Sequence, residues 1–186
     1  MARLIIGFTG EAGSGKDAAS HYLIERHGAR AFGFSSIIRD LIHRLYLVED
    51  RQTMATLSRI LRESFGEDLF GRVIAKDIAS CDADLIVVSG IRRTEDMQEL
   101  SRNPAFRLIY VEAPADVRFT RIRMRGQNAN DATMTFEEFK NEGELETERR
   151  IRNLKPLAHH VVENTGTVFE FYQTLDKILA ESRPTA

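Results

Sequence analysis

A glycine-rich stretch near the start of the chain has the residue types and the spacing of a phosphate-binding loop. From Gly10 the sequence reads G-E-A-G-S-G-K-D, which fits the pattern G-x-x-x-x-G-K. Glycines let several backbone N–H groups point into one concavity, the following helix directs its positive end there, and Lys16 adds a full positive charge. The stretch therefore predicts a cradle for a triphosphate, formed by Gly10, Gly13, Ser14, Gly15, Lys16, Asp17 and Ala18.

The residue after the lysine departs from this pattern, because Asp17 stands where Ser or Thr is usual. Magnesium at such a loop normally needs a hydroxyl from the loop and a carboxylate at the end of the third strand. Here the loop offers the acid, and the end of the strand expected at 85–88 offers Ser89. Our hypothesis is an exchanged Mg²⁺ site in which Asp17 holds the metal and Ser89 has a lesser part, with Glu112 as a second candidate carboxylate.

Arginines are concentrated in the helix expected after Glu112, where Arg118, Arg121 and Arg125 are three and four residues apart and form one stripe. A polar stretch follows at 127–133, and then a charged helix is expected from a capping box at Thr135 to about residue 153. This arrangement predicts a lid over bound phosphates at about 126–150. The alternative is a solvated helix face balanced by glutamates.

Other arginines have the placement of contacts to an acceptor molecule. Helices expected within about 36–80 carry Arg39, and also Arg59 and Arg62, which we expect to share one exposed face. Arg92 and Arg93 lie in a glycine-containing turn after a central strand, where a structural need for two arginines is hard to see. We therefore predict that the acceptor is bound by Arg39, Arg59, Arg62, Arg92 and Arg93.

The elements that must position these residues alternate along the chain. Strands are expected at 3–9, 31–34, 85–88, 106–111 and 160–162, with helices between them. This alternation predicts an α/β fold with a parallel sheet covered by helices on both faces. Ligands bind such sheets at the carboxyl ends of the strands, where the glycine-rich stretch and the turn at 89–93 both lie.

Composition places the chain among ordinary globular proteins. Its 186 residues, 42% of them hydrophobic, fit one domain over 1–186. The net charge of −2 gives no support for binding bulk nucleic acid, and no apolar run approaches the roughly 20 residues of a membrane span. A single cysteine, Cys81, fits a reducing compartment. We expect a cytoplasmic protein, monomeric or homodimeric, with no membrane partner.

Taken together, these motifs resemble a P-loop kinase of the nucleoside monophosphate kinase superfamily. The loop is similar to those of deoxynucleoside monophosphate kinases and of adenylate-kinase-like and dephospho-CoA-kinase-like relatives, and S-G-I-R from Ser89 resembles their D-G-I-R. The resemblance covers nearly the whole chain and implies a three-layer fold with a helical lid and a five-stranded parallel sheet of order 2-3-1-4-5. It further implies ATP and Mg²⁺, catalytic roles for Lys16, Arg121 and Arg125, and nucleotide contacts from Arg121, Thr165 and Gly166.

The favoured function is ATP-dependent phosphoryl transfer to a small phosphorylated acceptor, above all a (deoxy)nucleoside monophosphate. One alternative is a kinase of a dephospho-CoA-like or other small metabolite, whose hydroxyl acceptor would need a nearby carboxylate base. Another is a nucleotide-binding regulatory module without turnover, which the missing acid at Ser89 suggests.

Overall fold

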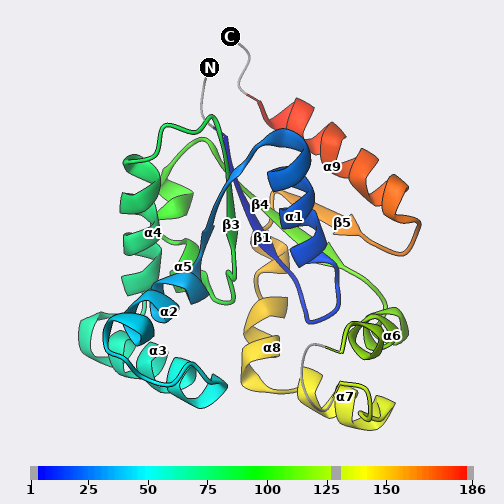
Figure 1. Cartoon of the computed structure of the whole chain (residues 1–186). Coiled ribbons are helices and arrows are strands. Elements are labelled where there is room, and N and C mark those ends of the chain that lie inside the picture. Colours follow the sequence, from blue (N-terminus) through cyan, green and yellow to red (C-terminus); the bar gives the residue numbers. More distant parts are fainter. Residues whose placement is uncertain (1–3, 127–130, 184–186) are drawn as a thin grey trace.

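The computed structural model describes residues 4–126 and 131–183 and contains one all-parallel sheet covered by helices on both faces (Figure 1). The strand order is β2-β3-β1-β4-β5, which confirms the predicted topology. Residue 3, with which the first strand was expected to begin, and residues 127–130 of the polar stretch lie outside the described residues. The strands are β1 (Leu4–Thr9), β2 (Arg30–Gly33), β3 (Leu85–Ser89), β4 (Phe106–Glu112) and β5 (His160–Glu163).

The helices divide between the two faces of the sheet and its carboxyl edge. Figure 1 shows α2 and α3 on one side of that edge and α6, α7 and α8 on the other, with the glycine-rich loop between them. The helices are α1 (Lys16–His27), α2 (Phe34–Arg44), α3 (Arg51–Phe65), α4 (Leu69–Ala79), α5 (Thr94–Met97), α6 (Ala115–Arg125), α7 (Phe136–Gly143), α8 (Glu146–Arg152) and α9 (Val168–Ser182), with 3₁₀ turns η1 (Leu100–Arg102) and η2 (Lys155–Leu157).

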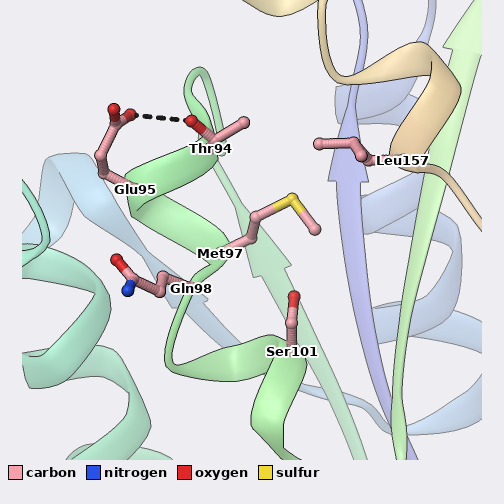
Figure 2. A pocket seen from close by; sticks show the side chains of 6 residues that line it. All are labelled: Thr94, Glu95, Met97, Gln98, Ser101 and Leu157. Atoms are coloured by element: carbon pink, nitrogen blue, oxygen red, sulfur yellow. Dashed lines mark hydrogen bonds between the residues drawn. The ribbon is translucent and has the colours of Figure 1, made fainter.

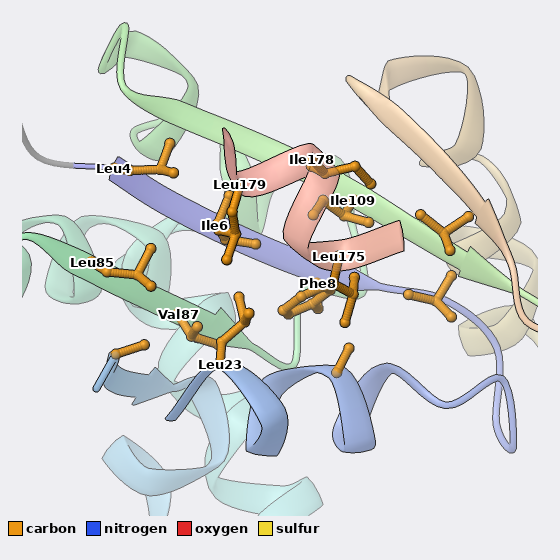
Figure 3. Close-up of a cluster of buried hydrophobic side chains, with 14 of the residues drawn as sticks. Leu4, Ile6, Phe8, Leu23, Leu85, Val87, Ile109, Leu175, Ile178 and Leu179 are labelled. Atoms are coloured by element: carbon orange, nitrogen blue, oxygen red, sulfur yellow. The ribbon is translucent and has the colours of Figure 1, made fainter. Parts of the chain in front are cut away.

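Strand β1 is buried on both faces, as its continuous apolar sequence requires. Ile6 packs on the side of α1 and α9, against Leu23 and Leu175, in the cluster drawn in Figure 3. Ile5 points to the opposite side, into a second cluster under α2 and α4. Because β1 also pairs with both β3 and β4, it is fixed from four directions, and the loop that leaves its carboxyl end starts from a rigid position.

The region after α6 differs from its prediction in one respect. The capping box at Thr135 forms, with its hydroxyl accepting from the Glu138 N–H at 3.2 Å. The single helix expected to run on to about residue 153 is wrong, because α7 ends at Gly143 and α8 begins only at Glu146. The Arg152 guanidinium donates to the Gly143 carbonyl at 2.7 Å, so a side chain of the second helix satisfies the end of the first.

A second capping box provides a stability prediction. The Thr167 hydroxyl accepts from the Glu170 N–H at 3.2 Å at the start of α9. Thr167→Ala is therefore expected to cost about 1 kcal/mol, or about 2–4 °C in the thermal midpoint. Thermal unfolding followed by circular dichroism measures this. The control is Thr174→Ala in the middle of the same helix, and equal midpoints for the two variants would contradict the assignment.

Over the described ranges, no helix combines the length and the apolar character that crossing a membrane requires.

Candidate functional site

The loop between β1 and α1 can form only with glycine at three of its positions. Gly10, Gly13 and Gly15 have φ angles of +147°, +78° and +103°. A Cβ on Gly13 would lie 2.6 Å from the Arg118 carbonyl oxygen. A Cβ on Gly10 would collide with the Val111 carbonyl, and one on Gly15 with the Asn164 amide. The glycines thus supply both backbone freedom and the space for close packing against β4, α6 and the end of β5.

Asn164 and Arg121 fix the loop from the side of β5 and α6. The Asn164 side-chain amide donates to the Ser14 carbonyl at 2.9 Å, and Arg121 donates to the same carbonyl at 3.3 Å and to the Asn164 carbonyl at 3.0 Å. Arg121, which was predicted to contact the nucleotide, therefore lies at the loop. Asn164 was not predicted, although it directly precedes the predicted Thr165 and Gly166, both of which are exposed.

Lys16 lies at the start of α1, where burial lowers the pKa of its amine below the ordinary 10.5. The charge of Asp17 opposes this shift in pKa, and the charge of Arg92 adds to it. The Asp17 carboxylate is 69% exposed, and its ion-pair partner is Arg125, 3.7 Å away between Oδ2 and Nη1. Arg92, Arg125 and Asp17, which are far apart in sequence, are therefore all within electrostatic reach of one amine.

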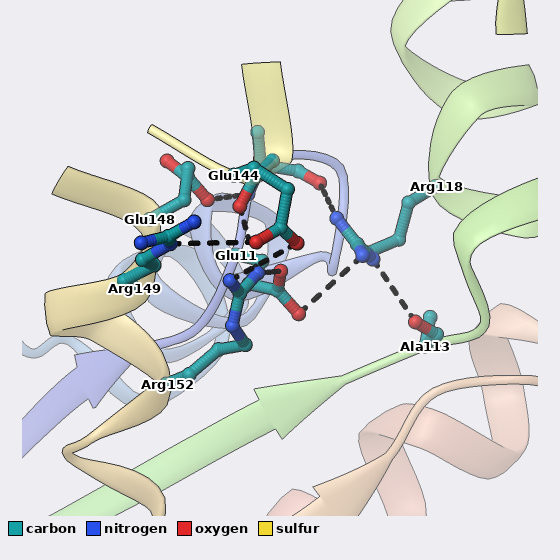
Figure 4. Close-up of polar contacts among 9 residues, drawn as sticks. Glu11, Ala113, Arg118, Glu144, Glu148, Arg149 and Arg152 are labelled. Atoms are coloured by element: carbon teal, nitrogen blue, oxygen red, sulfur yellow. Dashed lines mark hydrogen bonds and ion pairs between the residues drawn. The ribbon is translucent and has the colours of Figure 1, made fainter. Parts of the chain in front are cut away.

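Arg118 and Glu11 connect the loop to the predicted lid (Figure 4). Arg118 is buried and donates to the carbonyls of Ala12, at 3.2 Å, and Ala113, at 3.1 Å. The Glu11 carboxylate lies 3.4 Å from Arg118 and 3.1 Å from Arg152 of α8. The arginine stripe of α6 therefore faces the loop, as its spacing predicts.

A carboxylate of α8 also contacts the loop. The Glu148 Oε2 atom accepts from the Ala12 backbone N–H at 3.3 Å, which is the kind of donor that a phosphate oxygen would use. Glu148 also acts on Lys16: the negative charge of its carboxylate raises the pKa of the Lys16 amine and so partly opposes the effect of burial. Sequence reasoning treated the glutamates of this helix only as a solvated counterbalance, and nothing in their spacing distinguishes Glu148 from the others.

The two predicted magnesium ligands differ in accessibility. Asp17 is exposed beside the loop, whereas Ser89 ends β3 and is partly buried. Glu112, the second candidate carboxylate, forms an ion pair with Lys155 at 2.5 Å. Among residues 4–126 and 131–183, no group of three His, Cys, Asp or Glu side chains could hold a metal ion.

The predicted acceptor arginines separate into three environments. Arg39, Arg59 and Arg93 form exposed or half-exposed ion pairs, with Glu49 at 2.9 Å, Glu63 at 2.9 Å and Glu67 at 2.6 Å respectively. The hydrogen bonds from His43 and Arg39 lower the pKa of the Glu49 carboxyl.

Arg62 is the second case, and its expected exposure on the same face as Arg59 is wrong. It is 7% exposed and paired with Asp96 at 2.7 Å. Arg92 is the third case: it is exposed, and its guanidinium has no ion pair with any residue that the structure describes.

Two cavities of about 300 Å³ lie near these elements. The first is lined by Asp116, Val117, Thr120 and Arg121 of α6, so it shares Arg121 with the loop. The second, shown in Figure 2, lies between α5, η1 and η2. Its lining includes Met97 and Leu157 but none of the predicted site residues, so we do not assign it to the site.

No protein-family model matches the chain. Curated relatives named "UPF0200 protein" are 28% identical over 178 residues in Hyperthermus butylicus, covering 96% of this chain and 94% of the relative. In Sulfurisphaera tokodaii the identity is 25% over 175 residues, covering 94% and 95%, and in Methanosarcina barkeri it is 26% over 178 residues, covering 95% and 94%.

Solved structures share the fold at low sequence identity. TT1252 from Thermus thermophilus has a TM-score of 0.62 at 19% identity, covering 99% of this chain and 100% of that one. Shikimate kinase from Bacteroides thetaiotaomicron has a TM-score of 0.60 at 14% identity, covering 96% and 97%. Shikimate kinase from Acinetobacter baumannii, in complex with shikimate, has a TM-score of 0.55 at 15% identity, covering 96% and 94%. The chain therefore has the fold of the P-loop kinases.

Proposed function

We propose that this protein is an ATP- and Mg²⁺-dependent kinase of the nucleoside monophosphate kinase type, which transfers a phosphoryl group to a (deoxy)nucleoside monophosphate or a similar small phosphorylated acceptor. The observation that carries the proposal is the closely packed glycine loop with Lys16, Arg92 and Arg125 around it. Phosphoryl transfer depends mainly on positioning and charge stabilisation, and this arrangement supplies both.

Each group has a role in the proposed reaction. The loop N–H groups and Lys16 bind the β- and γ-phosphates of ATP. Arg125, which forms an ion pair with Asp17 next to Lys16, stabilises the transferring phosphoryl group. The α6 cavity would hold the base, since it is lined by Arg121, which donates to the carbonyl of Asn164, the residue before the predicted Thr165 and Gly166. Asp17 has the donor chemistry and the exposure to hold Mg²⁺, which when bound neutralises phosphate charge.

The acceptor is proposed to bind over the region 36–80, with α7 and α8 as the described part of the lid. Arg92 is the cation best placed to receive its phosphate, because no partner in the described residues competes for it. Arg39 and Arg93 can join, since exposed ion pairs of the kind they form contribute only about 0–1 kcal/mol and exchange readily. Arg59 has the same kind of exposed pair.

The test of this proposal is ADP formation from ATP and Mg²⁺ with a panel of nucleoside and deoxynucleoside monophosphates. Acceptor-dependent ADP formation, with the diphosphate product identified by mass spectrometry, is expected. Tight ATP binding without consumption in the presence of any acceptor would instead support a regulatory module. Failure to bind ATP would overturn the assignment of the loop.

A second candidate function is a kinase of a hydroxyl acceptor such as a dephospho-CoA-like metabolite. Glu148 favours it, because a carboxylate 3.3 Å from a loop N–H could accept a proton from an attacking hydroxyl. One of the solved structures with this fold is a shikimate kinase with shikimate bound, but its 15% identity supports the fold alone. Including dephospho-CoA and small alcohols in the panel separates the two candidates.

The contact between Glu148 and the loop gives a prediction for ATP affinity. Because a triphosphate must displace or repel this carboxylate, Glu148→Gln is expected to bind ATP about 5-fold more tightly, which corresponds to about 1 kcal/mol for a half-exposed charge. Titration calorimetry measures the affinity. The control is Glu146→Gln on the same helix, where the glutamate pairs with Arg150 instead of the loop. Unchanged or weaker ATP binding by Glu148→Gln would contradict the prediction.

The role of Asp17 is tested by Asp17→Ala, assayed over a series of Mg²⁺ concentrations. If the carboxylate holds the metal, half-maximal turnover should need roughly 10-fold more Mg²⁺, the order of effect expected when a metal's supporting ligand is lost. Glu181→Ala, which removes an exposed carboxylate of α9 outside the proposed site, is the control and should leave the Mg²⁺ dependence unchanged. An unchanged dependence on Mg²⁺ for Asp17→Ala would reject this site.

A further inference from the structure

Asp96 joins two segments that each contribute predicted acceptor arginines. It lies in α5, directly after the turn at 90–93, and is 1% exposed. Its Oδ2 atom accepts from the Arg92 backbone N–H at 3.0 Å, and its Oδ1 atom accepts from Arg62 Nη2 of α3 at 2.7 Å. One buried carboxylate therefore holds the backbone of one arginine and the side chain of another.

The two terminal nitrogens of the Arg62 guanidinium are both engaged within the protein. Besides its bond to Asp96, the guanidinium donates to the Glu67 carbonyl and lies 4.7 Å from the centre of the Phe70 ring. Its Nε is buried without a hydrogen-bond partner in the described part of the chain. A buried ion pair often stabilises a fold no more than apolar side chains of similar size would. Stability alone therefore does not explain why Arg62 and Asp96 occupy these buried positions.

The turn between β3 and α5 supplies that reason. Gly90 has a φ of +86°, and the Ile91 carbonyl accepts from the buried Thr9 hydroxyl at 2.9 Å. The turn is thus attached to the end of β1 on one side and, through Asp96, to α3 on the other. Between these attachments, the Arg92 side chain extends to the surface, and its charge contributes to the lowered pKa of Lys16.

We propose that Arg62 and Asp96 form a buried positioning pair that fixes Arg92 next to the phosphate loop. The inference rests on the proposed function, since it assumes that the loop binds phosphates. It gives Arg62 a role through Arg92 in place of the direct acceptor contact expected from the sequence, and it adds Asp96 to the site.

The test is a double-mutant cycle on binding of inorganic tripolyphosphate, measured by titration calorimetry, so that it needs neither turnover nor a known acceptor. The pair is removed by combining Arg62→Met with Asp96→Leu, which leaves no unpaired charge buried. Arg92→Met alone is expected to weaken binding about 10-fold, because it removes one of the positive charges that act at Lys16. The pair variant should weaken binding by a similar factor, and adding Arg92→Met to it should weaken binding little further.

A matched control makes the same exchanges at an exposed pair nearby. Arg102→Met combined with Glu99→Leu removes an ion pair of η1, and wild-type affinity is expected. The inference is overturned if the Arg62–Asp96 pair variant binds tripolyphosphate as tightly as wild type, or if Arg92→Met does not weaken binding. It is also overturned if the combined variant loses affinity by the product of the two separate factors, because the pair would then act independently of Arg92.

Gly71→Ala gives a second route that changes no charge. A Cβ on Gly71 of α4 would lie 2.7 Å from the Asp96 carbonyl oxygen, so α5 must shift. Weaker tripolyphosphate binding is expected, with little further loss when Arg92 is already Met. This variant decides the question if the pair variant does not fold, and wild-type binding by Gly71→Ala would then overturn the inference.

The same data distinguish this inference from the proposed function. A non-additive cycle without ADP formation from any acceptor would keep the positioning pair and reject the kinase. Acceptor-dependent ADP formation with an additive cycle would keep the kinase and reject the pair. Absence of tripolyphosphate binding by the wild-type protein would overturn both.

Discussion

Lys16→Met is expected to lower the rate of ATP consumption by about 100- to 1,000-fold, the usual loss when one charge-stabilising donor is removed from a reaction centre. Lys16 is the positive charge at the start of α1 beside the glycine loop, and methionine keeps most of its length and apolar stem. Initial rates of ADP formation with the acceptor found in the panel measure the effect. Because burial disfavours the charged form of this amine, removing it should not lower the thermal midpoint.

The matched control for this variant is Lys177→Met, which changes an exposed lysine of α9 outside the proposed site. It should retain the wild-type rate. The lowered pKa of Lys16 adds a pH dependence: the amine loses its proton at a lower pH than an ordinary lysine, so ATP affinity should decline before pH 10.5 is reached. Near-wild-type turnover by Lys16→Met would contradict its proposed role.

Arg62→Ala is expected to destabilise the protein by about 3–5 kcal/mol, because it leaves the buried Asp96 carboxylate without its ion partner. In a chain of this size each kcal/mol lowers the thermal midpoint by about 2–4 °C. Urea unfolding followed by circular dichroism gives the free energy of unfolding directly. This is the largest stability effect that we predict for a single side chain of the site.

The control lies one turn away in the same helix. Arg59→Ala removes an exposed i,i+4 ion pair with Glu63, which is worth about 0.3–0.5 kcal/mol. The two substitutions are chemically identical, so the difference between them measures burial and pairing alone. Similar free energies of unfolding for the two variants would mean that the Arg62–Asp96 pair is not buried in solution.

The sheet and its loop could be predicted because their signals are local. The apolar run of β1 followed by glycines and Lys16 indicates a strand, a phosphate turn and a helix within 20 residues, and the alternation of elements indicates a parallel sheet. The strand order, which was inferred from family resemblance, is confirmed. The arginine stripe of α6 was also recognisable, because residues three and four apart share a helix face.

The remaining contacts of the site could not be predicted, because their partners are distant in sequence. Asp96 lies 34 residues from Arg62, and Glu148 lies 136 residues from Ala12. Helical periodicity marks an arginine as polar and places it on the outside, so it could not show that Arg62 turns inward to a buried acid. The break between α7 and α8 was not predicted either, because the pattern of charged residues continues through it without interruption.

The attachment of Asn164 to the loop has a consequence for how the protein is made. Its amide donates to the Ser14 carbonyl across 150 residues of chain, so the phosphate cradle is encoded around residues 10–16 and completed only at residue 164. During synthesis, the ribosome releases every glycine of the loop long before β5 exists. A growing chain therefore carries the motif without its finished shape, and nucleotide can stabilise the protein only once synthesis has passed β5.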